Sequence, residues 1–132
     1  MNKDTKCSII TEIHSKMLKF NLPYKFPFER GKTNGFDYCG FFISIPKERW
    51  LLLCWSDESQ NFFNKSFWLE FSSNAANKWS DRGNTPYVCD GKEYCVENHP
   101  NTPKRLVIPL DIKRNNMINV INLIKSVSKE VL

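Results

Sequence analysis

The sequence lacks the signatures of several common protein classes. It holds two histidines and five glycines, and the glycines are scattered, so it contains no phosphate-binding loop, no dinucleotide-binding turn and no G-x-S-x-G nucleophile motif. The longest apolar run, Trp50 to Trp55, is far shorter than the ~20 residues that cross a bilayer. These absences weigh against nucleotide-dependent chemistry and against a membrane protein.

The sequence also shows no sign of secretion. No apolar signal-peptide core follows Lys3 and Lys6, because Ile9 and Ile10 lead directly to Glu12. The cysteines form an odd set without the tight spacing of secreted frameworks, which favours reduced thiols. We therefore expect a cytoplasmic protein. The five cysteines are Cys7, Cys39, Cys54, Cys89 and Cys95.

What is present describes one folded domain over residues 1–132. The chain is 41% hydrophobic, 25% charged and 14% aromatic, which is typical of a globular protein. Its net charge of +5 is uneven: residues 1–35 carry seven basic and three acidic side chains, residues 36–103 six and nine, and residues 104–132 six and two. An acidic middle fits a basic protein partner at least as well as nucleic acid, and the alternative is that these charges are simply solvated.

The first half of the chain predicts a helix followed by strands. Ile9, Ile10, Ile13, Met17 and Leu18 form a helical stripe, which predicts a helix over about 5–20 with Asp4 or Thr5 as its cap, followed by a basic connector over 21–35. Residues 41–45 and 50–55 predict a hairpin through 46–49, and the second run is apolar enough to be covered on both faces. Residues 67–71 alternate and predict a half-buried strand.

The second half predicts another hairpin, a strand and a helix. We favour a surface loop over a short helix for 72–84, and Asp90-Gly91 predicts a tight turn between strands at 87–89 and 93–96. Pro109 places the strand 105–110 at an edge or a bulge. The final helix has Asn115 or Asn116 as its cap and buries Met117, Val120, Ile121, Ile124, Val127 and Val131. The fold class is α+β, with an antiparallel sheet of about five or six strands flanked by N-terminal and C-terminal helices.

The most enzyme-like constellation is an acid-x-Lys pair after an apolar strand. Asp111 and Lys113, together with Asp90, resemble in their spacing the PD-(D/E)xK nuclease superfamily, in which two carboxylates hold Mg²⁺ and a lysine orients water. The alternative is structural, because Asp90 is also the natural residue of the Asp90-Gly91 turn and Pro109 distorts the strand.

Metal and thiol chemistry have weaker support. Cys89, Cys95 and His99 would need a fourth zinc ligand, such as Cys39, Cys54 or His14, and their spacing does not match the tight knuckle of structural zinc sites. A cysteine nucleophile would need His14 or His99 nearby, and His14 beside the apolar stripe favours a partly buried structural role. We predict no metal, no other cofactor and no catalytic residues.

Binding to a partner is the better-supported hypothesis. Trp79 lies in a charged segment with Lys78, Asp81 and Arg82, which is typical of an interface anchor, although the ring could also fold back onto the sheet. Stacking of nucleic acid on tryptophans is less favoured, because Trp50, Trp55 and Trp68 lie on strands. An acidic patch is predicted from Asp57, Glu58, Asp90, Glu93 and Glu97.

In size and layout the chain resembles bacterial toxin-immunity proteins, including those of contact-dependent growth inhibition. The resemblance rests on Ile9 to Leu18 and Met117 to Val131 as flanking helices, with Phe41 to Trp55 and Phe67 to Phe71 as the sheet. It implies a protein that neutralises a cognate toxin by binding it. We therefore expect a specific inhibitor of a toxin with a basic surface, such as a nuclease. The alternatives are a small Mg²⁺-dependent nuclease and a nucleic-acid-binding accessory protein.

Overall fold

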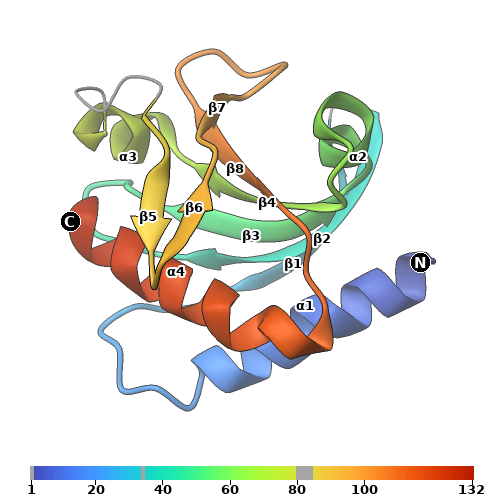
Figure 1. Ribbon diagram of the computed structural model, residues 1–132, viewed down its shortest axis with the longest axis horizontal. Helices are drawn as coiled ribbons and strands as arrows, with labels where there is room; N and C mark the ends of the chain where they lie inside the picture. Colours follow the sequence, from blue (N-terminus) through green and yellow to red (C-terminus); the bar gives the residue numbers. More distant parts are fainter. Residues whose placement is uncertain (1, 34, 80–84) are drawn as a thin grey trace.

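The computed structural model describes residues 2–33, 35–79 and 85–132, and it has the expected α+β class (Figure 1). Six strands form one antiparallel sheet in the order β1-β2-β3-β4-β8-β7, and β5 pairs with β6 separately. The elements are α1 (Lys3–Met17), β1 (Phe28–Thr33), β2 (Phe36–Ile43), β3 (Leu51–Ser56), α2 (Asp57–Phe63), β4 (Phe67–Phe71), α3 (Ser73–Lys78), β5 (Tyr87–Cys89), β6 (Lys92–Tyr94), β7 (Glu97–Asn98), β8 (Leu106–Leu110), the 3-10 turn Arg114–Asn116 and α4 (Met117–Glu130).

The main core lies between one face of the sheet and the two terminal helices (Figure 1). The predicted stripe of α4 is confirmed, since all six of its apolar residues are buried. The stripe of α1 is confirmed except at Leu18, which is 59% exposed because the helix ends at Met17. The cap of α1 is Asn2 rather than Asp4 or Thr5, and its side chain accepts a hydrogen bond from the backbone N–H of Thr5.

The opposite face of the sheet, called the outer face below, is also covered over its central strands. A second apolar cluster lies there, formed by Leu52, Cys54, Trp68 and Val107, with Phe63 of α2 packed against it. Every residue of β3 is buried, as predicted. Every residue of β4 is buried too, so the prediction of a half-buried strand is wrong, because α2 and the segment after β7 cover its outer side chains.

Besides the two-residue strand β7 and the short 3-10 turn, three further elements were not predicted. Residues 28–33, expected to lie in the connector, form the edge strand β1, which pairs with β2 from Phe28 opposite Phe41 to Thr33 opposite Phe36. Residues 73–78, expected in a loop, form α3, whose first turn is capped by the Ser72 side chain. Helix α2 begins in the same way, with the Ser56 side chain accepting from the backbone N–H of Glu58. These segments carry no apolar period. Their secondary structure therefore depends on serine caps and on pairing with a neighbouring strand.

The predicted turns are confirmed. The 46–49 connection places Lys47 and Glu48 at positive φ, and Asp90 and Gly91 have φ of 52° and 77° in the β5–β6 turn. Strand β7 reaches β8 only at Leu106 and Val107, so at Pro109 the far side of β8 is a sheet edge that needs no donor. Asn116 precedes α4 as predicted, but its side chain accepts from the backbone N–H of Lys113 instead of capping the helix.

Gly40 of β2 lies opposite Cys54 in a close strand contact, which gives a first stability prediction. A Cβ at Gly40 would lie 2.5 Å from the Cβ of Cys54 and 2.5 Å from the backbone oxygen of Leu53. Gly40→Ala should therefore lower the free energy of unfolding in urea by about 1–3 kcal/mol. The control is Gly31→Ala, where a Cβ would meet only the Tyr38 side chain at 3.6 Å. Equal stability of the two variants would contradict this packing.

Candidate binding sites

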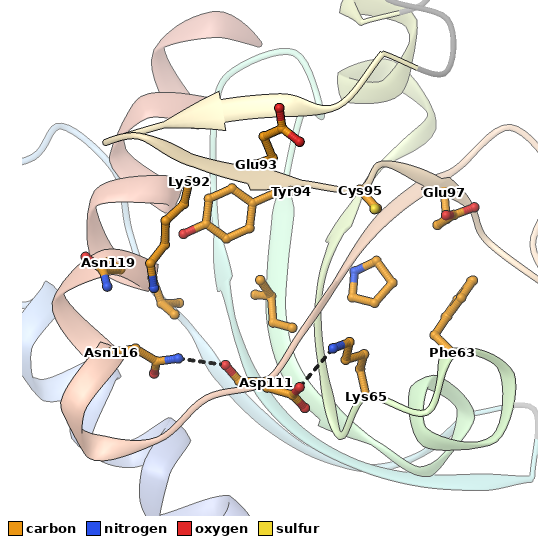
Figure 2. A pocket seen from close by; sticks show the side chains of 13 residues that line it. Phe63, Lys65, Lys92, Glu93, Tyr94, Cys95, Glu97, Asp111, Asn116 and Asn119 are labelled. Carbon is orange, nitrogen blue, oxygen red and sulfur yellow. Dashed lines mark hydrogen bonds and ion pairs between the residues drawn. The ribbon is translucent and has the colours of Figure 1, made fainter.

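An open cleft lies between the β5–β6 hairpin on one side and β8 with α4 on the other (Figure 2). Its volume is about 380 Å³. The hairpin and β7 contribute charged side chains, whereas β8 supplies an apolar floor. The lining residues are Phe63, Lys65, Lys92, Glu93, Tyr94, Cys95, Glu97, Pro109, Leu110, Asp111, Asn116, Asn119 and Val120.

Asp111 is paired within this cleft, but not with the expected partners. Its carboxylate accepts from Lys65 Nζ at 2.9 Å, and its backbone oxygen accepts from Asn116 Nδ2 (Figure 2). Neither Asp90 nor Lys113 lines the cleft, and the Asp90 carboxylate accepts from Asn122 Nδ2 instead. Asp111 directly follows β8, which ends at Leu110, so the acid-x-Lys pair lies after an apolar strand as expected. Of the three residues of the alternative nuclease constellation, only Asp111 therefore lines this cleft.

The acidic patch is present in part. Glu93 on the hairpin and Glu97 on β7 are exposed at the rim of the cleft (Figure 2), and neither has an ion pair within the described residues. Asp90 is exposed at the hairpin turn, and Asp57 is half-buried at the start of α2. Glu58 is fully buried and so does not belong to any surface patch. It was misassigned because a two-residue acidic pair at a helix start gives no sign of which side chain points inward.

The prediction that Trp79 is exposed in a loop is wrong. Trp79 is only 4% exposed, and its ring packs against Phe71 and Tyr87 at centroid distances of 4.7 and 5.0 Å. It follows α3 directly, and the helix end turns it into the main core. The ring therefore cannot serve as an exposed anchor. Lys78 is exposed at the end of α3, while Asp81 and Arg82 lie outside the described residues.

A cluster of ionisable side chains is buried on the outer face of the sheet. The spacing of these residues in the sequence does not predict it. Glu70 of β4 accepts from Arg105 at 3.0 Å. His99 Nε2 lies 3.8 Å from a Glu58 oxygen and 3.7 Å from a Glu70 oxygen, and its ring packs on Trp68. The Asn101 side chain donates to Glu58. Four charged or ionisable groups thus meet where α2, β4 and the segment between β7 and β8 come together.

The hydrogen bonds of His99 fix its tautomer. Nδ1 accepts from the backbone N–H groups of Asn101 and Thr102 at 3.1 and 2.9 Å, so the proton of the neutral ring lies on Nε2, facing the two carboxyls. Burial lowers the pKa of His99, although the Glu58 charge opposes this. Burial raises the pKa of Glu70 from its ordinary 4.5 to about 7, against the opposing charge of Arg105. The Glu70 carboxyl therefore changes charge near neutral pH.

A second cavity of about 240 Å³ adjoins this cluster and shares no lining residue with the cleft. The Arg105 guanidinium lies 4.8 Å from the centroid of the Trp50 ring at its wall, and Tyr38 donates to Glu29. Burial and the Glu29 carboxylate raise the pKa of Tyr38 to about 12, so its hydroxyl stays protonated. The lining residues are Glu29, Tyr38, Phe42, Trp50, Leu52, Cys54, Ser56, Trp68, Glu70 and Arg105.

The cysteines and His14 do not come together in a metal or thiol site within the described residues. All five cysteines are free, and Cys95 is exposed whereas the nearby His99 is buried with Nδ1 already hydrogen-bonded. His14 is half-buried, as predicted, and its Nε2 lies 2.7 Å from the backbone oxygen of Phe26. Across residues 2–33, 35–79 and 85–132, no group of three or more His, Cys, Asp or Glu side chains has an arrangement that could hold a metal ion.

One signal in the sequence could have pointed to the buried cluster. Glu70 alternates with Trp68 on a strand of aromatic residues, and a carboxyl in such a strand requires a buried partner. The identity of that partner was not readable, because Arg105 and His99 follow in a loop 29 or more residues later.

Comparison with known proteins adds no family to this description. No protein-family model, curated protein or solved structure matches the chain. In the part of the chain that the structure describes, none of the helices has both the length and the apolar character that crossing a membrane requires.

Proposed function

We propose that the protein is an inhibitory binding protein of the immunity type, which neutralises a cognate protein toxin in the cytoplasm by binding a basic surface at or near the toxin's active site. The observation that carries the proposal is the exposed acidic pair Glu93 and Glu97 at the open cleft. These two carboxylates have no ion pair within the described residues, so their charge is available to a partner.

The chemistry of the cleft suits a protein surface with basic side chains. Lys65 already pairs with Asp111, which leaves Lys92 against Glu93 and Glu97 among the charged lining residues. The acidic pair at the rim would steer a basic partner, and unpaired rim charges act mainly on association rate and specificity. The partly exposed Tyr94 and Pro109 provide apolar area that a partner can cover, which is where binding energy concentrates. Toxins that cleave nucleic acid present basic surfaces because they must bind phosphate.

This cleft replaces the contact surface expected from the sequence. Trp79 is in the core and Glu58 is buried, so the proposed surface consists of Glu93, Glu97 and the aromatic Tyr94 between them in sequence. Asp90 at the hairpin turn extends it, since its side chain is exposed.

The test is affinity capture from a lysate of the native host, with the wild type and the double variant Glu93→Lys/Glu97→Lys side by side. The wild type should retain one stoichiometric protein partner, and charge reversal should weaken that complex by at least about tenfold. The matched control is Asp4→Lys/Glu12→Lys, which makes the same charge change on α1 and should bind as the wild type does. Equal loss in both double variants would show a net-charge effect and contradict the assignment to the cleft.

Two further outcomes would replace the proposal with another function. Recovery of nucleic acid without a protein partner, lost at high salt, would support an accessory nucleic-acid-binding protein. Cleavage of DNA or RNA by the purified protein with Mg²⁺, abolished by Asp111→Ala, would support a nuclease. The proposal predicts neither result.

A further inference from the structure

The cavity on the outer face has walls that are mostly aromatic and a floor that is ionisable. Its aromatic rings come from two strands and the β2–β3 connection: Tyr38 and Phe42 from β2, Trp68 from β4, and Trp50 from the connection. Glu70 lies among them, only 6% exposed, so any group that meets its carboxyl is largely removed from water. Electrostatic contacts in such a site are stronger than at an open surface.

The balance of charge around the cavity is negative. The carboxyls of Glu29 and Glu70 line it, and that of Glu58 lies behind Glu70 with His99 Nε2 between them, against the one guanidinium of Arg105. His99 does not add a positive charge at neutral pH, because burial lowers its pKa. Arg105 occupies one oxygen of Glu70, and the other lies 3.7 Å from His99 Nε2, beyond hydrogen-bond distance. That second oxygen can accept from a ligand.

The contacts of Arg105 show that the wall of this cavity favours a cation. The Arg105 guanidinium lies over the Trp50 ring while it pairs with Glu70. A cation over an indole face and beside a carboxylate gains from both the ring quadrupole and the opposite charge. An anion would meet the Glu29 and Glu70 carboxyls as well as the guanidinium, and Nη1 of that guanidinium is already held by Glu70.

We propose that this cavity binds an organic monocation, a guanidinium or primary ammonium group on a short apolar stem. The charged group is held by the open oxygen of Glu70 with Glu29 at the rim, and the stem packs against the aromatic walls. The volume of about 240 Å³ corresponds to roughly eight water molecules at ~30 Å³ each, which fits a ligand the size of an arginine or lysine side chain. This site is separate from the cleft of the proposed function and does not depend on it.

Binding should depend on pH through Glu70. The groups that face this carboxyl are Arg105 from the segment before β8, His99 from the segment after β7, Glu58 from α2 and Cys54 from β3. Because the pKa of Glu70 is about 7, its carboxyl is mostly neutral at pH 5.5 and mostly ionised at pH 8. A cation therefore binds more tightly at the higher pH, by roughly tenfold over this interval.

The four tryptophans supply a direct readout by NMR of the indole N–H signals. Trp50 and Trp68 line the cavity, whereas Trp55 and Trp79 lie in the main core and serve as internal references. Titration with n-butylguanidinium or n-butylammonium should shift the first two signals saturably and leave the references in place. The neutral n-butanol should give no saturable shift. N-acetyl-arginine amide tests whether a protein side chain, rather than a free amine, can supply the cation.

Substitution of Glu70 tests whether its carboxylate holds the cation. Glu70→Gln should weaken cation binding by about tenfold or more and remove its pH dependence, whereas Glu12→Gln on α1, which lines neither the cavity nor the cleft, should leave both unchanged. The pH profile of the wild type tests the same point without any substitution. Equal shifts with n-butanol, tighter binding of n-butyrate than of the cations, a flat pH profile, or no saturable shift would each overturn the proposal.

Discussion

Trp79→Ala is expected to lower the free energy of unfolding by about 3–5 kcal/mol, the range for removal of a buried tryptophan from a core. The ring is 4% exposed and packs between Phe71 of β4 and Tyr87 of β5. Its loss would leave a cavity that joins the main sheet, α3 and the hairpin, and these elements cannot collapse together without moving strands. Equilibrium unfolding in urea, followed by circular dichroism, measures the effect.

The control for this variant is Phe62→Ala, because Phe62 is 47% exposed on α2 and should change stability by less than about 0.5 kcal/mol. The comparison also separates two roles for Trp79. If the ring were an interface anchor, its removal would weaken partner binding while the stability stayed near that of the wild type. That result would contradict the structure described above.

Glu70→Gln is expected to change how stability depends on pH. In the unfolded chain this carboxyl has its ordinary pKa of 4.5, and in the folded protein burial raises it to about 7. Between these values the folded protein holds a proton that the unfolded chain has released, so the contribution of Glu70 is fully present below pH 4.5 and is lost as pH rises through 7. At about 1.4 kcal/mol per pKa unit, the loss approaches about 3 kcal/mol.

A glutamine at this position keeps the neutral form at every pH. The stability of Glu70→Gln relative to the wild type should therefore rise by up to about 3 kcal/mol between pH 4.5 and pH 8. His99 acts in the opposite direction, because its pKa is lowered and its contribution is lost as pH falls, but both proteins carry it. Urea unfolding at several pH values measures the difference, with Glu97→Gln as the exposed control. Parallel stability curves would show that Glu70 is not buried as an ionisable group.

The parts of the fold that could be predicted are those where apolar residues recur with a helical period or form a continuous run. The stripes of α1 and α4 and the apolar runs of β2, β3, β4 and β8 are of this kind. Strand β1 could not be found in this way, since Phe28–Thr33 is a polar edge strand defined by its pairing with β2. Helices α2 and α3 span seven and six residues and depend on single serine caps, too short for a period to appear.

The candidate sites also contain features that local sequence predicts and features that only the fold shows. Exposure of Glu93 follows from its place in a polar hairpin, which the Asp90-Gly91 turn identifies, whereas the pairing of Glu97 with β8 through β7 is visible only in the fold. Charged neighbours suggested that Trp79 is exposed, but the end of α3 turns this one ring inward. The Glu70–Arg105 pair spans 35 positions and the Lys65–Asp111 pair 46, so neither is visible without the fold. Long-range polar contacts are specified by topology rather than by spacing.

The most direct test of the central claim is a titration of inhibition. The partner captured by the wild-type protein is purified, its toxic activity is assayed, and the protein is added in increasing amounts. We expect complete inhibition at a 1:1 ratio, with Glu93→Lys/Glu97→Lys needing at least about tenfold more protein and Asp4→Lys/Glu12→Lys matching the wild type. A partner that binds with full stoichiometry yet keeps its activity, or inhibition that ignores charge reversal at the cleft, would contradict the account.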